Sequence, residues 1–480
     1  MDAAPPVASA APSRFCGSHA PHELAEVLAL LLPLLPLDCR ARAACVCRAW
    51  RAAAAHPALW EELNFERCTA CVDNAALAAL CARAGAALRS LFLDDNGCAD
   101  VTSAGLLTAL HGGGCTGLRL LSMPCVLRAS FRTTFSAEQV QQLAAACPRL
   151  THATCAVSCT VADAAAAVAA LPGPLWLICS GNGEGLMQLA EFLRVNATLT
   201  RLGLGENDIG DAGATQLAEC LRVNATLTSL GLVGNDIGAA GATQLAECLR
   251  VNATLTSLEL GSNLIGAAGA TQLADCLRVN ATLTSLKLGF NRICAAGATQ
   301  LGECLRVNAT LTSLDLCHND IGAAGATQLA ECLRVNATLT FLGLGGNDIG
   351  EMGVTRLAEC LRVNATLTSM ELGSNHIGAA GATQLADCLR VNATLTSLKL
   401  AFNRICDAGA TQLAECLRVN ATLTRLGLVD NDIGAAGATQ LAECLRVNAT
   451  LTSLDLRDNG IGDASALRAA CSPQCTLLIG

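Results

Sequence analysis

Cysteine is the residue type in this sequence that could carry the most chemistry, because the 480-residue chain contains 28 of them. Cys68 and Cys71 stand in the C-x-x-C spacing that is typical of zinc ligands, and Cys81 and Cys98 follow downstream. No second C-x-x-C and no histidine pair completes a ligand set. We therefore interpret these residues as core cysteines of irregular repeats, and we expect no metal and no other cofactor.

A second set of nine cysteines, from Cys220 to Cys444, recurs at one position every 28 residues. Equivalent helices in stacked repeats lie roughly 8–10 Å apart, which exceeds the ~7 Å separation of Cα atoms that a disulfide allows. We predict small buried thiols in a reducing compartment instead of a disulfide framework. The sequence contains no P-loop, dinucleotide-binding or Ser/Cys–His nucleophile motif, so we expect a protein that is not an enzyme.

The octapeptide LRVNATLT occurs ten times, and each copy holds an Asn-Ala-Thr glycosylation sequon, from Asn196 to Asn448. The N-terminal sequence resembles no signal peptide, and the apolar run 28–37 contains two prolines and is too short for a membrane helix. Asn196 stands where a helix must stop. We predict that it adopts the left-handed conformation there and bonds nearby backbone, so that the sequons mark structural corners.

The elements that position these residues can be predicted from one 28-residue copy, 199–226. The spacing L-x-x-L-x-L-x-x-N-x-I from Leu199 to Ile209 predicts a short strand with inward leucines. The second half places apolar residues at i, i+3 and i+4, which predicts a helix. Asn207 and its equivalents, to Asn459, are predicted to bond backbone groups that the turn leaves unpaired.

These repeats resemble the ribonuclease-inhibitor-like class of leucine-rich repeats. The resemblance implies an α/β solenoid, a horseshoe with a concave parallel β-sheet and convex α-helices. Geometry favours the curve, because parallel strands lie ~4.8 Å apart while helices need roughly 8–10 Å. The resemblance covers ten regular repeats in 187–480 and continues less regularly through 66–186, with strands predicted within 88–96, 118–125 and 174–182.

A longer period is also present, because residues 257–312 nearly recur at 369–424, an offset of four repeats. This recurrence indicates duplication of a four-repeat block. We therefore predict a partner-binding surface that partly repeats itself.

Residues 21–65 differ from the repeats, and they follow a segment, 1–20, that we expect to be disordered. Pro21, the block V-C-R-x-W at 46–50 and the block H-P-x-L-W at 56–60 resemble an F-box, a small all-α module. In that family the segment docks onto the adaptor subunit of a cullin–RING ubiquitin ligase. The alternative is a helical cap that shields the first repeat. The resemblance implies an adaptor-binding face of Pro21, Leu24, Val46, Cys47, Arg48 and Trp50.

Residues between the strand leucines are predicted to face the concave side and to bind a partner. Charged residues on adjacent strands could instead form a row of surface ion pairs, each contributing about 0.2–1 kcal/mol. The phenylalanines are either interface anchors or packed over the strand-to-turn edge. The candidate partner-binding residues are Arg201, Glu259, Lys287, Phe290, Asp315, His318, Phe341, Glu371, Lys399, Phe402 and Arg425.

The order F-box then repeats is that of F-box/leucine-rich-repeat receptors. It implies a substrate-recognition subunit of an SCF-type ubiquitin ligase, with the adaptor and an unidentified target protein as partners. The net charge is -9, and the charged residues are spread along the chain. We therefore expect neither a nucleic acid nor a membrane as a partner. We expect a cytoplasmic or nuclear protein. The sequence indicates no particular oligomeric state. The alternatives are an interaction scaffold without a ligase role and, by fold analogy alone, a GTPase-activating protein.

Overall fold

The computed structural model describes residues 60–65, 72–93, 98, 100–123, 134–159, 175–179, 184–197 and 199–479. The segment predicted to be disordered and nearly all of the F-box-like segment lie outside these residues. The chain divides into two units, Met1–Thr134 with Gln139–Cys155, and Phe135–Glu138 with Ala156–Gly480.

In its described part, the first unit has strands followed by helices, as the irregular repeats predict. Leu63, Leu91 and Leu121 are the central residues of three parallel strands, lie in register with one another and are buried. The elements are β1 (Glu62–Asn64), α4 (Asn74–Ala84), η3 (Gly85–Ala87), β2 (Ser90–Phe92), α5 (Ser103–Gly112) and β3 (Leu120–Ser122), followed at the boundary of the two units by β4 (Thr134–Phe135), α6 (Ala137–Ala146) and β5 (His152–Cys159). β2 and β3 lie within the predicted stretches 88–96 and 118–125, whereas β1 corrects a prediction, because it lies in the segment 21–65 that is predicted to be all-α.

The second unit repeats one short strand and one helix, as predicted from the 28-residue period. Its strands are β6 (Leu175–Cys179), β7 (Arg201–Gly203), β8 (Ser229–Gly231), β9 (Ser257–Glu259), β10 (Ser285–Lys287), β11 (Ser313–Asp315), β12 (Phe341–Gly343), β13 (Ser369–Glu371), β14 (Ser397–Lys399), β15 (Arg425–Gly427), β16 (Ser453–Asp455) and β17 (Thr476–Leu478). Each strand pairs in parallel with the next one along the chain.

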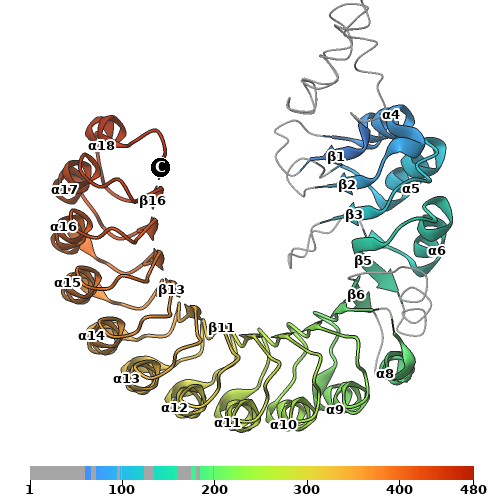
Figure 1. The fold of residues 1–480 in the computed structure, drawn as a ribbon, viewed down its shortest axis with the longest axis horizontal. Helices are drawn as coiled ribbons and strands as arrows, with labels where there is room; N and C mark the ends of the chain where they lie inside the picture. The colour runs from blue at the N-terminus through green and yellow to red at the C-terminus, as the bar shows by residue number, and fades with distance from the viewer. Residues whose placement is uncertain are drawn as a thin grey trace, which may run out of the picture. The chain divides into compact units, whose positions relative to one another are not determined.

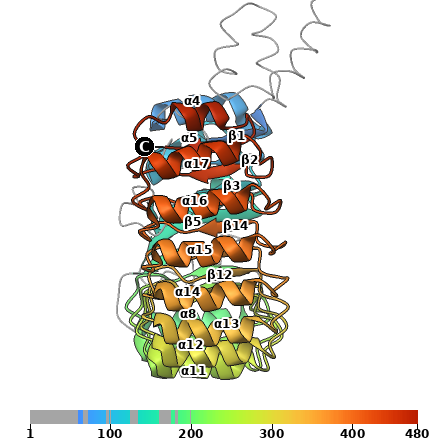
Figure 2. The same cartoon turned by 90° about the vertical axis from the view of Figure 1, so that its left-hand side faces the viewer.

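The helices of the second unit stack in the same order as the strands. They are α8 (Glu184–Val195), α9 (Gly210–Leu221), α10 (Ala239–Leu249), α11 (Gly266–Leu277), α12 (Cys294–Leu305), α13 (Gly322–Leu333), α14 (Gly350–Leu361), α15 (Gly378–Leu389), α16 (Cys406–Leu417), α17 (Ala435–Leu445) and α18 (Ser465–Ala470). Figure 2 shows the later helices side by side in parallel rows.

The core of the second unit lies between the sheet and the helices. In one repeat, Leu314 and Leu316 come from the strand side, and Leu329, Cys332 and Leu333 come from the helix side, all nearly inaccessible to water. Burial of a leucine side chain stabilises the fold by about 1.5–3 kcal/mol relative to exposure. Because the strands lie closer together than the helices, the unit curves with strands β7 to β16 on the inner side and helices α9 to α17 on the outer side (Figure 1).

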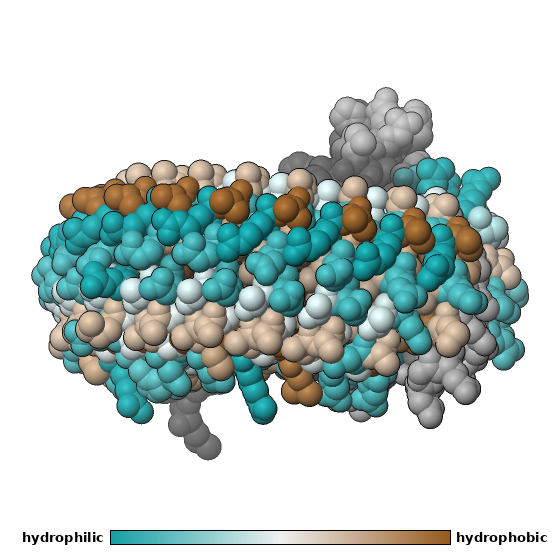
Figure 3. All heavy atoms as spheres, turned by 90° about the horizontal axis from the view of Figure 1, so that it is seen from below, coloured by the Kyte–Doolittle hydropathy of each residue, from teal (hydrophilic) through white to brown (hydrophobic). Residues whose placement is uncertain are grey.

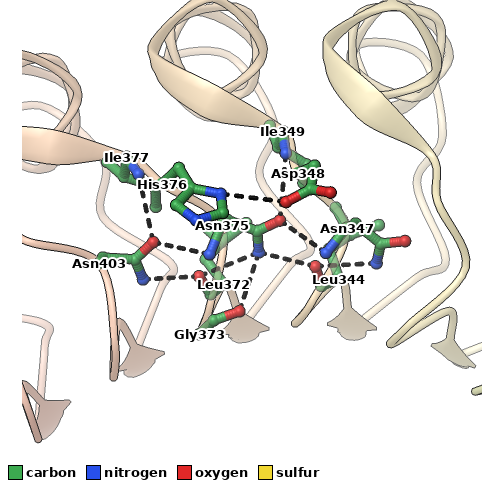
Figure 4. A network of polar contacts seen from close by, with 10 residues as sticks. All are labelled: Leu344, Asn347, Asp348, Ile349, Leu372, Gly373, Asn375, His376, Ile377 and Asn403. Carbon is green, nitrogen blue, oxygen red and sulfur yellow. Dashed lines mark hydrogen bonds and ion pairs between the residues drawn. The ribbon is translucent and has the colours of Figure 1, made fainter.

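An asparagine ladder connects the strand ends of the second unit, and we use this name for Asn207 and its nine equivalents up to Asn459. Figure 4 shows three of its rungs. The Asn375 side-chain amide donates to the carbonyl oxygen of Leu344, 2.8 Å away in the preceding repeat, and its Oδ1 accepts from the backbone N–H of Asn347 at 3.0 Å. The ladder therefore satisfies buried backbone groups of the turn, as predicted.

The sequon asparagines have a related role at the helix ends. The Asn224 amide nitrogen donates to the Leu193 carbonyl at 2.7 Å, and Asn224 Oδ1 accepts from the Leu227 N–H at 2.8 Å. The prediction of backbone bonding is confirmed, but the prediction of a left-handed conformation is wrong, since none of the sequon asparagines from Asn224 to Asn448 has a positive φ. The corner is closed by these side-chain bonds together with backbone bonds such as that from the Asn224 N–H to the Cys220 carbonyl oxygen at 3.0 Å. The amide nitrogen to which a glycan would be attached is thus on a buried residue and already donates to a backbone carbonyl.

The nine periodic cysteines are buried free thiols, as predicted. Burial raises the pKa of seven of them, including Cys248 and Cys304, to about 12. These thiols stay protonated and unreactive while the repeat is folded. Among the described residues, no helix has the length and apolar character needed to cross a membrane.

Candidate protein-binding surface

The three-residue strands present two columns of side chains on the inner face of the second unit. In each of the strands β7 to β16 the central residue is buried, so the first and third residues point away from the core. The structure places eight of the predicted partner-binding residues in these columns. Arg201, Phe341 and Arg425 are first residues of strands, and Glu259, Lys287, Asp315, Glu371 and Lys399 are third residues.

The charges of the third column form two separate ion pairs. Lys287 Nζ lies 2.6 Å from Glu259 Oε1, and Lys399 pairs in the same way with Glu371. Asp315 is a register neighbour of Lys287, but it accepts instead from a backbone N–H in its own turn, that of Cys317 at 3.0 Å. The predicted row of charges is thus interrupted. Since both lysines are at least half exposed, each pair stabilises the fold by less than about 1 kcal/mol.

Phe290, His318 and Phe402 do not lie on the strands, which corrects the prediction that they are strand residues. Each stands three residues beyond the end of its strand and has a left-handed backbone, with φ of 59°, 55° and 59°. The Phe290 N–H still donates to the Cys317 carbonyl of the next repeat, but the chain then turns. The two-residue alternation of a strand therefore ends before these residues.

The two turn phenylalanines are more than half exposed. Phe290 stacks on His318, with ring centroids 4.1 Å apart and 13° between the planes, yet 55% of its surface remains accessible. Phe402 is 54% accessible, and the position equivalent to His318 in the following repeat is occupied by Asp430. Neither ring is packed against the strand-to-turn edge as a core residue would be, whereas Phe341 on β12 is half-buried.

A further surface, which the sequence did not reveal, is formed by the residues directly before and after each ladder asparagine. We call it the turn rim. Eight of its twenty residues are acidic, and one of its histidines, His376, places Nδ1 3.0 Å from Asp348 Oδ1 (Figure 4). The rim residues are Glu206, Asp208, Gly234, Asp236, Ser262, Leu264, Phe290, Arg292, His318, Asp320, Gly346, Asp348, Ser374, His376, Phe402, Arg404, Asp430, Asp432, Asp458 and Gly460.

The outer face carries a third periodic pattern. Ion pairs join helices of adjacent repeats, such as Arg418 with Glu443 at 2.9 Å. Beside them, Figure 3 shows strongly hydrophobic residues recurring in a row near one edge, next to a row of hydrophilic ones. The exposed residues with this period are Val195, Val223, Val251, Val279, Val307, Val335, Val363, Val391, Val419 and Val447.

The predicted adaptor-binding residues Pro21, Leu24, Val46, Cys47, Arg48 and Trp50 lie outside the described residues, and so do Cys68 and Cys71. The described end of the F-box-like segment is part of the first unit. Trp60 and Phe65 are buried there, and the Arg83 guanidinium lies 5.8 Å from the centroid of the Trp60 ring. Cys81 and Cys98 are buried as well.

Two protein families match the chain. The F-box-like family matches residues 25–66. The Leucine Rich repeat family matches 195–218, 223–246, 251–274, 279–302, 307–330, 363–386, 391–414, 419–442 and 447–467. The repeat between the fifth and sixth of these ranges still forms β12 and α14 in register with its neighbours. No curated protein shows significant similarity to the chain.

Solved structures are also similar to parts of the chain. Actin-binding site 2 of leiomodin-1 is 23% identical over 32% of this chain and 88% of its own, with a TM-score of 0.29. The leucine-rich repeat-containing protein LegL7 from Legionella pneumophila is 19% identical over 62% of this chain and 95% of its own, with a TM-score of 0.41. The family matches and the strand–helix repeats carry the assignment. With an F-box-like segment in front of nine matched repeats, the chain belongs to the F-box/leucine-rich-repeat proteins.

Proposed function

We propose that this protein is a substrate-recognition subunit of an SCF-type cullin–RING ubiquitin ligase, working in the cytoplasm or nucleus. The observation that carries the proposal is the order of its parts, an F-box-like segment at 25–66 followed by leucine-rich repeats. The F-box-like segment would bind the adaptor subunit, and the repeats would bind a target protein.

In this role the chain contributes no reacting group of its own. It holds a target close to a ubiquitin-charged enzyme, and proximity then raises the rate of transfer. The curved sheet suits this task. The residues at the first and third strand positions vary from repeat to repeat, whereas the buried residue between them is leucine in every strand from β7 to β16 except β13, where it is Met370. The inner face can therefore change its specificity without any change in the core.

Adaptor docking is tested by co-purification of the full chain with the adaptor. We expect a complex with the natural sequence and its loss in the double variant Val46→Ala, Trp50→Ala. The matched control is Arg425→Ala, which alters an exposed strand residue of the repeats and should leave adaptor binding unchanged. Circular dichroism would establish that both variants keep the repeat fold. Absence of binding by the intact, folded protein at micromolar concentration would refute the proposal.

The alternative role is a protein-interaction scaffold without ligase activity, in which residues 21–65 only cap the repeats. The burial of Trp60 and Phe65 in the first unit favours a capping contribution. Under this alternative, deletion of residues 1–62 unfolds the first repeats while the full chain binds no adaptor. Hydrogen exchange at β2 and β3, combined with the co-purification above, separates the two roles.

A further inference from the structure

We propose that the turn rim carries two equivalent docking points, one at Phe290 and Arg292 and the other at Phe402 and Arg404. The occupant is one extended protein segment that presents an apolar side chain beside a carboxylate twice. The proposal deepens the target-binding half of the proposed function, and it does not depend on adaptor docking by the F-box-like segment.

The two points have the same geometry four repeats apart. Phe290 and Phe402 both have a φ of 59°, and Arg292 and Arg404 both have a φ of 52°. The accessible fractions of the two rings agree, at 55% and 54%. The ion pairs on the adjoining strands, Lys287 with Glu259 and Lys399 with Glu371, recur at the same offset.

Stability of the fold does not account for a phenylalanine at these positions. The turn imposes a left-handed backbone there, which glycine adopts freely and a bulky side chain adopts at a cost. Gly234 and Gly346 occupy the equivalent position in other repeats, with φ of 66° and 68°. Because more than half of each ring faces water, Phe290 and Phe402 recover little of that cost by burial. Exposed aromatic residues of this kind are typical anchors of protein interfaces.

Charge indicates the chemistry of the occupant. Eight carboxylates line the turn rim, and Arg292 and Arg404 are its two arginines. Neither guanidinium has an ion-pair partner among the described residues, whereas Lys287 is neutralised by Glu259. Each docking point is therefore an exposed ring with an unpaired cation in acidic surroundings. A segment with an apolar side chain and a carboxylate complements these two points and is repelled by the rest of the rim.

The distance between the points sets the length of the segment. Phe290 and Phe402 are separated by four strand spacings of about 4.8 Å, or at least about 19 Å. An extended chain advances about 3.3 Å per residue, so roughly six or more residues separate the two anchors of the occupant. When one segment engages both points, the second contact forms within the complex, so the affinity for the whole segment exceeds the affinity of either point alone.

The two points are not identical in their surroundings. Leu264 and His318 flank the first point, and His376 and Asp430 occupy the equivalent places at the second. The first point is thus more apolar and carries the stacked Phe290–His318 pair. We infer that the first point binds its half of the segment more tightly.

The test is a selection of random-peptide libraries on the full chain, followed by fluorescence anisotropy with synthetic peptides that carry one or two copies of the selected motif. Phe290→Gly and Phe402→Gly remove the rings with the residue that the same turn uses elsewhere, so the variants keep the fold. Arg292→Asp reverses the charge with the residue found at the equivalent Asp320. Ser262→Gly, at the equivalent rim position, is the matched control.

We expect selected peptides to combine an apolar residue with an acidic one, and two-copy peptides to bind at least about tenfold more tightly than one-copy peptides. Phe402→Gly should reduce two-copy binding to the one-copy level, and Phe290→Gly, which leaves only the weaker second point, should reduce it further. The double glycine variant should abolish binding, and Ser262→Gly should not change it. Selection of no peptide, selection of peptides without carboxylates, equal affinities for one and two copies, or full binding by the double variant would each overturn the proposal. Adaptor co-purification on the same variants reports separately on the proposed function.

Discussion

Replacement of Asn375 by alanine probes the asparagine ladder in the middle of the second unit. Asn375 is fully buried and makes five side-chain hydrogen bonds to the backbone. Its amide donates to the carbonyl oxygens of Leu344, Leu372 and Gly373 at 2.8, 3.0 and 3.1 Å, and its Oδ1 accepts from the N–H groups of Asn347 and Ile349 at 3.0 and 3.3 Å.

The magnitude depends on which backbone groups lose their last partner. The three carbonyl oxygens each keep another donor, namely the amides of Asn347 and Asn403 and the N–H of Gly346. The N–H groups of Asn347 and Ile349 keep none in Asn375→Ala. A buried donor without a partner costs about 1–3 kcal/mol, so we expect a loss of about 2–6 kcal/mol in the free energy of unfolding.

Urea unfolding followed by circular dichroism measures this loss, and hydrogen exchange identifies the amides responsible. The matched control is Asn459→Ala, which removes the same pattern of bonds from a partly exposed rung, where water can reach the freed N–H groups. We expect less than half the effect there. The reasoning is refuted if Asn375→Ala costs less than about 1 kcal/mol, if both variants lose equal stability, or if the amides of Asn347 and Ile349 keep their protection.

Three other outcomes follow from the side chains described above. Iodoacetamide should modify the exposed Cys294 and Cys406 of the folded protein within minutes and the buried Cys248 only in denaturant, as peptide mass spectrometry would show; equal labelling of all three would contradict the burial. Because burial raises the pKa of Cys248 to about 12, the contribution of its thiol to the free energy of unfolding is complete below about pH 9 and falls by up to about 1.4 kcal/mol per pH unit above that pH, in addition to the fall caused by the other buried thiols; a Cys248→Ala variant should therefore show an alkaline decline in titrated unfolding curves that is shallower by up to that amount. Lys287→Met should change the melting temperature by little, since its ion pair with Glu259 is half exposed, and a loss of more than about 1 kcal/mol would show that the pair is stronger than we infer.

Much of the fold could be predicted from the sequence because each repeat contains the residue pattern of one strand and one helix. Leu202 and Leu204 are buried beside β7, and Leu217 with Cys220 faces the core from α9, as the two periodicities predict. Because the same pattern recurs in every regular repeat, each copy supports the same assignment of strand and helix. Ten nearly identical copies leave little freedom for an alternative register.

The parts that failed depend on conformations that spacing does not encode. Phe290 and His318 each follow a strand of only three residues. The alternation of side chains along a strand does not extend to them, so it wrongly places them on the inner face of the sheet. Two glycines at the start of α9 show the same limit. No atom lies within 4 Å of a Cβ built at Gly210, and its φ of 58° is the feature that the turn needs, whereas a Cβ at Gly213 would lie 2.4 Å from Leu186. A positive φ and close packing both require glycine, and only the three-dimensional structure shows which of the two applies at a given position.

The asparagine ladder also makes the length of the solenoid adjustable in whole steps. The side chain of each rung donates to a carbonyl oxygen and accepts from a backbone N–H of the repeat before it, and the backbone N–H of the rung donates to the asparagine side chain of the repeat after it. Any copy of the repeat supplies these groups. Deletion or insertion of one 28-residue copy therefore joins two compatible ends. The spacing between surface features changes by one strand step each time, while every side chain in the core keeps the neighbours it had. Recombination between copies of the repeat can in this way retune what the protein spans without any new point mutation.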